Sequence, residues 1–212
     1  MKRLMTVLGI LLAGAIGCDD PPSATVRSAV DAFPNVVGTQ WTYYWIDSLT
    51  DITDTVVVSI DGTEQYQGRS AKLWRARFRN TLDSWGDPRI DTYHVIEAGD
   101  TVLAYRSASP NLLSLLYPLQ VGKSWTSGEG LVDSSAVAET LPTYGLPMGP
   151  LHDVFRVRRQ YTLADSLSEQ SDLYLVAGYG LVQMRFLLVD LHAEPDTIVN
   201  EHWLLLDYEA AD

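Results

Sequence analysis

Cysteines, paired histidines and long hydrophobic runs are scarce in this chain, and each scarcity excludes a class of protein. Cys18 is the only cysteine among 212 residues, so no internal disulfide can form. The four histidines lack the H-x-H and H-E-x-x-H spacings of zinc sites, and no G-x-S-x-G elbow or phosphate-binding glycine loop is present. The longest mostly apolar run, residues 4–16, is shorter than the roughly 20 residues that span a bilayer. We therefore expect no metal site, no catalytic residues, no cofactor and no enzymatic activity.

The N-terminus has the residue order of a secretory signal peptide. A basic start, Met1-Lys2-Arg3, precedes the apolar run and the small residues that end at Cys18. Residues 15–18 resemble the lipobox of bacterial lipoproteins, with Ala15 where leucine is usual. The resemblance implies a signal peptide over 1–17, cleavage before Cys18 and lipidation of Cys18. A lipid anchor followed by a flexible tether over 18–32 would hold the protein at a membrane of the bacterial cell envelope, on the periplasmic face of either membrane or on the cell surface.

Positive charge is also scarce. Removal of residues 1–17 removes Lys2 and Arg3 and leaves 13 basic against 27 acidic side chains, a formal charge of −14. Such a surface repels phosphate backbones, so nucleic acid is excluded as a partner. The membrane is a partner only through the lipid anchor, and an apolar ligand or another envelope protein remains open.

The rest of the chain has the period-two pattern of β-strands. Residues 55–60 and 71–78 are typical strands, and Glu97-Ala98-Gly99-Asp100 is typical of a hairpin turn. Asp61-Gly62 is the dipeptide of a turn, and residues 111–116 are the best candidate for a short helical turn. We expect a single, mainly β domain over 33–212, a curved antiparallel sheet that forms either an open half-barrel or a sandwich.

One motif occurs twice. Phe33-Pro-Asn-Val-Val-Gly-Thr-Gln-Trp-Thr42 and Tyr117-Pro-Leu-Gln-Val-Gly-Lys-Ser-Trp-Thr126 share an aromatic residue, a proline, Val-Gly and Trp-Thr at the same spacing. Further on, residues 73–77 match 154–158 at a similar offset. The ordered matches predict that the domain consists of two homologous halves, about 33–110 and 117–212.

These phrases resemble those of a broad group of uncharacterised bacterial lipoproteins. That group carries an F-P-x-x-V-G-x-x-W phrase after its tether and a G-x-G-L-V strand near its end, which corresponds here to residues 178–182. Ala177 stands where proline is usual before the last glycine pair. The resemblance implies an envelope-anchored β domain and supplies no catalytic residue.

The strand that follows the first motif is rich in aromatic residues. Alternation places Trp41, Tyr43 and Trp45 on one face and Tyr44 on the other. These four residues are a candidate ligand face for a sugar or a lipid. The alternative is a wedge that fixes the first strand of each half onto the core, which fits the second copy better because Trp125-Thr126 has no aromatic row after it.

The arginines concentrate in two predicted strands. Arg75 and Arg77 lie in one and Arg156 and Arg158 in the other, on the face opposite the apolar side chains. Guanidinium groups in a row can bind an anion in a bidentate manner, so these four form a candidate anion site. The alternative is pairing with carboxylates on neighbouring strands.

Three functions remain open for such a chain. The first is a lipid-anchored envelope protein with a non-enzymatic binding or structural role. The second is a carrier, in which a half-barrel holds a lipid or another apolar ligand on its aromatic face. The third, an envelope polysaccharide hydrolase, would need paired carboxylates that the sequence does not identify.

Overall fold

A computed structural model describes residues 33–106, 113–126, 132–163, 167–192 and 197–211 of the chain. The strands are β1 (Gln40–Asp47), β2 (Ile52–Tyr66), β3 (Arg69–Leu82), β4 (Pro88–Ala98), β5 (Thr101–Arg106), β6 (Leu113–Leu116), β7 (Ser124–Trp125), β8 (Val132–Leu146), β9 (Gly149–Leu163), β10 (Leu167–Val176), β11 (Gly180–Asp190) and β12 (Thr197–Glu209). Within the described ranges no helix has the length and apolar character needed to cross a membrane. The expected signal peptide, Cys18 and the tether lie outside these ranges.

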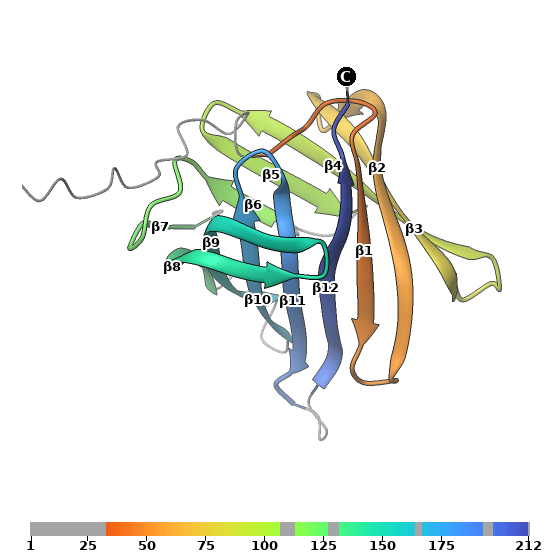
Figure 1. Ribbon diagram of the computed structural model, residues 1–212. Helices are drawn as coiled ribbons and strands as arrows, with labels where there is room; N and C mark the ends of the chain where they lie inside the picture. Colours follow the sequence, from red (N-terminus) through yellow and green to blue (C-terminus); the bar gives the residue numbers. More distant parts are fainter. Residues whose placement is uncertain (1–32, 107–112, 127–131, 164–166, 193–196, 212) are drawn as a thin grey trace, which may run out of the picture.

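The strands form one antiparallel sheet with the order β6-β5-β4-β3-β2-β1-β12-β11-β10-β9-β8-β7. β1 pairs with β12 at the centre, and each half of the chain forms a meander on its own side (Figure 1). The sheet rolls until its two edge strands meet. At that point the Trp125 indole on β7 donates a hydrogen bond to the Ser114 carbonyl on β6 over 3.1 Å. The predicted curved, mainly β fold is confirmed, and the sheet is a nearly closed barrel and not a sandwich.

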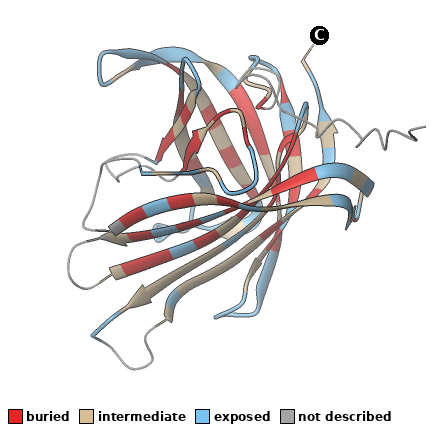
Figure 2. Cartoon of the chain, turned by 90° about the vertical axis from the view of Figure 1, so that its left-hand side faces the viewer, coloured by how far each residue is buried: buried red, intermediate tan, exposed pale blue. Residues whose placement is uncertain are grey.

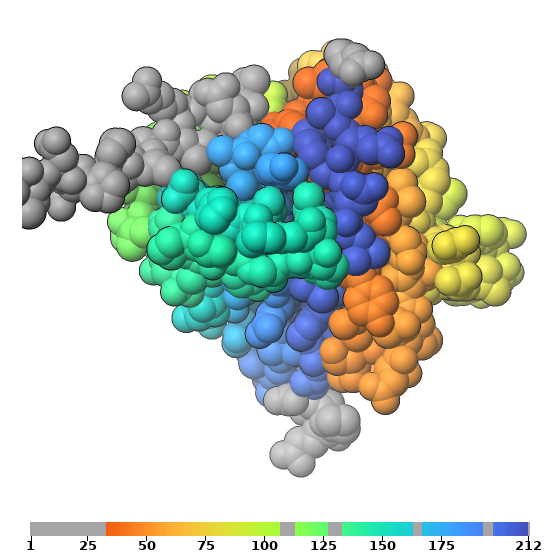
Figure 3. All heavy atoms as spheres, in the orientation of Figure 1, coloured from red at the N-terminus to blue at the C-terminus, as the bar shows by residue number. Residues whose placement is uncertain are grey.

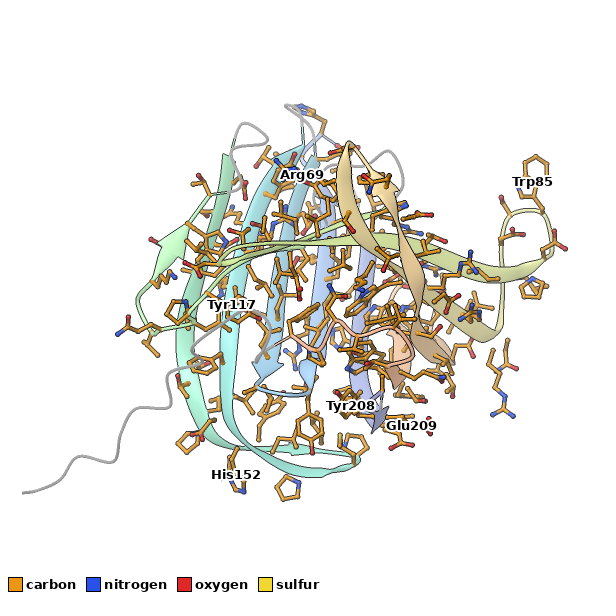
Figure 4. The ribbon with its side chains drawn as sticks, turned by 90° about the horizontal axis from the view of Figure 1, so that it is seen from above. Arg69, Trp85, Tyr117, His152, Tyr208 and Glu209 are labelled. Atoms are coloured by element: carbon orange, nitrogen blue, oxygen red, sulfur yellow. The ribbon has the colours of Figure 1, made fainter. Side chains whose placement is uncertain are left out.

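The core lies inside the roll and follows from the alternation of each strand. Trp41, Tyr43 and Trp45 of β1 face inward, as do Trp74 and Phe78 of β3. Figure 2 shows buried and exposed residues alternating along the strands, and Figure 4 shows side chains within the space that the sheet encloses. Burial of each large apolar side chain contributes about 1.5–3 kcal/mol, so this aromatic interior holds the two meanders together.

The two copies of the repeated motif form the same turn. Gly38 has φ 98° and Gly122 has φ 84°, both in the left-handed region that glycine favours. The Gly38 amide donates to the Ile60 carbonyl, and the Gly122 amide donates to the Val137 carbonyl in the same way. The sheet register shifts directly after both of these partner residues. The motif is therefore a structural turn in each half, whereas the common origin of the halves stays a prediction.

Two local expectations were wrong. Asp61-Gly62 is not a turn, because β2 continues to Tyr66 and the sheet register shifts between Ile60 and Gly62. A β-bulge uses the same residue types as a turn, so the dipeptide alone does not separate the two. Leu113–Leu116 is a strand and not a helical turn, because β5 supplies its hydrogen-bonding partner and Leu113 and Leu115 are buried. The hairpin turn between β4 and β5 lies where it was expected.

Candidate functional site

The aromatic row of β1 lies in the core. Trp41, Tyr43 and Trp45 are 1%, 4% and 3% exposed, and only Tyr44 reaches the surface, at 36%. The Tyr43 hydroxyl donates to the Leu181 carbonyl at 2.6 Å, and burial raises the pKa of this phenol well above its usual value. A surface platform needs exposed rings, so Trp41, Tyr43 and Trp45 do not form a platform at the surface of the protein. Their burial agrees with the alternative, a wedge that fixes this strand onto the core.

The interior cavity beside these rings is small. Its volume is about 90 Å³, whereas pockets for small ligands measure about 300–1,000 Å³. Its walls come from both halves of the chain and include Tyr43, Val58, Trp74, Val95, Leu173, Leu181, Met184 and Trp203. This cavity is too small for an acyl chain.

The arginines of β3 pair with a carboxylate on the neighbouring strand. Arg75 Nη1 lies 3.1 Å from Asp61 Oδ2, and Arg77 contacts the same oxygen. Partial burial acts to raise the pKa of Asp61, but hydrogen bonds from Ser59 and Arg77 outweigh it and hold that pKa below its usual value. Asp61 therefore stays ionised and neutralises part of this arginine row.

The arginines of β9 also face carboxylates. Arg156 donates to both oxygens of Asp172, at 3.0 and 2.8 Å, and to Glu139 at 2.9 Å. Arg158 donates its Nε to Asp172 at 3.3 Å. β2, β1, β12, β11 and β10 separate β3 from β9 in the sheet, so the four predicted arginines do not converge on one anion site. Cross-strand pairing is what the structure shows for them.

A groove of about 330 Å³ lies on the outer face of β9, β10, β11 and β12. The strand register aligns two rows of outward-facing side chains along it. The first row is Arg158, Asp172, Arg185 and His202, and the second is Gln160, Gln170, Leu187 and Asn200. Neighbouring strands are about 4.8 Å apart, so each row crosses about 14 Å of sheet.

The β8–β9 hairpin projects over this outer face and forms one side of the groove. Its tip folds back over β10 and β11, where Tyr144 stacks on Tyr174 with 5.0 Å between ring centroids. The Tyr144 hydroxyl also donates to Gln183 Oε1 at 2.6 Å. Figures 1 and 3 show β8 and β9 in front of β11 and β12. The hairpin covers Tyr174 and Gln183, which form the cross-strand pair next to the first row. It leaves the two rows of the groove uncovered.

Positive charge exceeds negative charge in the groove. Asp172 already accepts hydrogen bonds from Arg156 and Arg158. Arg185 is exposed and makes no salt bridge within the described ranges. Burial, together with the positive charge of Arg185, lowers the pKa of His202. The imidazole is therefore neutral at pH 7 and can both donate and accept a hydrogen bond.

Most residues of this groove could not be predicted from the sequence. Arg158 was predicted as an anion-site residue because it belongs to a row of arginines in one strand. Arg185 and His202 are single residues in two other strands, so no pattern within either strand indicates a site. Their alignment with Arg158 depends on the register of three strand pairs, and alternation predicts only the face of each side chain. Among the described residues, no three His, Cys, Asp or Glu side chains group in a way that could hold a metal ion.

Comparisons with known proteins add a likeness of fold. No family model matches the chain, and no curated protein matches it. A solved structure of a protein inferred to be exported, with a YmcC-like fold, from Bacteroides fragilis aligns over 84% of this chain and 98% of its own, at 12% identity and a TM-score of 0.43. A protein inferred to be a lipoprotein, from Parabacteroides distasonis, aligns over 84% and 97%, at 10% identity and a TM-score of 0.38. Both TM-scores are below 0.5, so neither likeness indicates a function for this chain.

Proposed function

We propose that this chain is a lipid-anchored protein of the bacterial cell envelope that binds a ligand through the outer groove of β9–β12 and has no enzymatic activity. The observation that carries the proposal is the contrast between two spaces. The outer groove, about 330 Å³ in volume, has the size of a ligand site, and the interior cavity beside the rings of β1, about 90 Å³, does not. The residue order that ends at Cys18 supports the anchor.

The anchor and the groove are tested separately. For the anchor, the full-length chain and its Cys18→Ser variant are compared by cell fractionation and by mass spectrometry of the N-terminus. The wild type should be cleaved before Cys18, acylated and found with the membrane, whereas the variant should lack the acyl chains. A variant that is processed and membrane-bound like the wild type would contradict the lipid anchor.

For the groove, Leu187→Trp places a large side chain on its floor. Val57→Trp is the matched control, because Val57 is a half-buried residue on the outer face of β2 in the other half of the sheet. A thermal-shift screen of envelope-derived small molecules should find ligands that stabilise the wild type and the control but not Leu187→Trp. If every stabilising ligand acts equally on all three proteins, the groove is not the binding site.

A further inference from the structure

The groove combines guanidinium groups, amides and a neutral imidazole, and this combination defines a ligand chemistry. From the alignment of Arg185 with His202 and of Gln170 with Asn200, we propose that the groove binds a carboxylate carried by a hydroxylated ligand, such as an acidic sugar. The carboxylate would pair with Arg185, and the amides of the second row would bind hydroxyl groups. This inference rests on the proposed function, since it names what that groove would bind.

The local charge favours an anion in spite of the acidic protein. On the outer face at and beside the groove, Arg156, Arg158 and Arg185 stand against Asp172 and Glu139, which is one positive charge in excess. Arg159 also lines the groove, but it is buried and pairs with Glu169 and Asp133. The mature chain as a whole would carry −14. Such a surface repels anions at a distance, so only direct contact with exposed guanidinium groups can hold one. The Arg158 side chain is 61% exposed, and Arg185 is exposed as well.

Asp172 determines where in the first row an anion can bind. Its carboxylate lies between Arg158 and Arg185 in the same cross-strand row. Hydrogen bonds from Arg156 hold the pKa of Asp172 below its usual value although partial burial acts the other way, so it stays ionised. An anionic ligand is repelled by this carboxylate. Its charged group should therefore bind at Arg185 and not at Arg158, which Asp172 already neutralises in part.

The second row supplies polar groups without charge. Gln160 and Gln170 are exposed, and Asn200 is half-buried on the adjacent strand pair. Each amide can both donate to and accept from a hydroxyl group. Leu187 lies between Gln170 and Asn200 in the row and offers an apolar floor for C–H groups. A hydroxylated ring with one carboxylate matches this distribution.

His202 reports on occupancy. Its pKa is lowered first by burial and then by the charge of Arg185. A carboxylate bound to Arg185 would offset that charge, so the pKa of His202 should rise when the groove is filled. The other histidines, His94, His152 and His192, do not line the groove.

The test uses the full-length lipidated chain in detergent with three probes: D-glucuronate, D-glucose and D-glucose 6-phosphate. Isothermal titration measures binding, and NMR follows the four histidines during a pH titration. We expect glucuronate to bind more tightly than glucose by at least about tenfold, because a charge-assisted hydrogen bond has about that effect. Saturating glucuronate should raise the pKa of His202.

Arg185→Gln should weaken glucuronate binding by at least about tenfold. Arg75→Gln is the matched control, because it removes a partly exposed arginine from the outer face of β3, and it should leave binding unchanged. Equal binding of glucose and glucuronate through the groove, blocked by Leu187→Trp, would overturn the carboxylate inference and leave the proposed binding function intact. Stronger binding of the phosphate, no binding of glucuronate, or binding insensitive to Arg185→Gln would also overturn it.

Discussion

Asp54 is the residue whose replacement has the best-defined expected cost. Its side chain is 4% exposed, with no cation among its bonded partners. The carboxylate instead accepts hydrogen bonds from the amides of Thr55, Asn80 and Thr81 and from the side chains of Asn80 and Thr81. These contacts join the start of β2 to the end of β3. Asp54→Asn replaces one acceptor oxygen with an NH₂ group that faces donors.

The cost follows from this geometry. Hydrogen bonds to a charged group contribute about 1.5–3 kcal/mol each, and a buried donor without an acceptor costs about 1–3 kcal/mol. We expect Asp54→Asn to lower the free energy of unfolding by about 3 kcal/mol at pH 7, since the variant loses the charge and sets donors against donors. Urea denaturation of residues 19–212, followed by tryptophan fluorescence, measures the difference.

The pH dependence gives a second check. Burial acts to raise the pKa of Asp54, but the hydrogen bonds from Asn80 and Thr81 outweigh it and hold the folded-state pKa below its usual value. The stability that Asp54 contributes is therefore complete above the unfolded-state pKa of about 3.9 and is lost as the pH falls through the folded-state pKa. The difference between wild type and Asp54→Asn should narrow from pH 5 to pH 2.

Asp51→Asn is the control for this pair of measurements. Asp51 is exposed and has φ 55°, a conformation that asparagine also adopts, so its replacement should change stability by less than about 0.5 kcal/mol. The reasoning is refuted if Asp54→Asn is as stable as Asp51→Asn at pH 7, or if its deficit does not shrink in acid.

Further substitutions test the turns, the β8–β9 hairpin and the interior. Gly38→Ala and Gly122→Ala should each lower stability by about 1–2 kcal/mol because of their positive φ, whereas Gly62→Ala, with open space around it, should cost less than about 0.5 kcal/mol by thermal unfolding. Tyr144→Phe should lower stability by about 1–2 kcal/mol and speed hydrogen exchange in the β8–β9 tip, because a buried glutamine loses its donor; unchanged exchange would contradict the covering role of the hairpin. Tyr43→Ala should lower stability by about 3–5 kcal/mol. Native mass spectrometry of residues 19–212, which lack the anchor, should find no lipid bound without a covalent link, because the cavity beside Tyr43 measures only about 90 Å³; a co-purifying lipid would contradict this.

The sequence predicted which face of each strand is buried better than it predicted how strands align. Alternation placed Trp41, Tyr43 and Trp45 on one face of their strand, and that face is the buried one. The Asp61-Gly62 bulge was missed, because a bulge and a turn use the same residues. Strand existence is local, whereas a bulge depends on the partner strand.

The groove likewise depends on which residues of neighbouring strands lie side by side. Arg158, Asp172, Arg185 and His202 meet only because three strand pairs have the registers that the structure shows. A shift of one residue in any pair would turn that strand's side chains to the other face. Single-sequence patterns contain no information on this alignment, so the arginines were grouped by strand and not by row.

The most direct test of a binding groove on the outer face is a crystal structure of the full-length chain, purified in mild detergent and soaked with D-glucuronate. The proposal predicts ligand density beside Arg185 and His202, with the carboxylate at the guanidinium and the hydroxyl groups along Gln170 and Asn200. Ligand density in the interior between Tyr43 and Leu173, or a groove without ligand at saturating concentration, would contradict it.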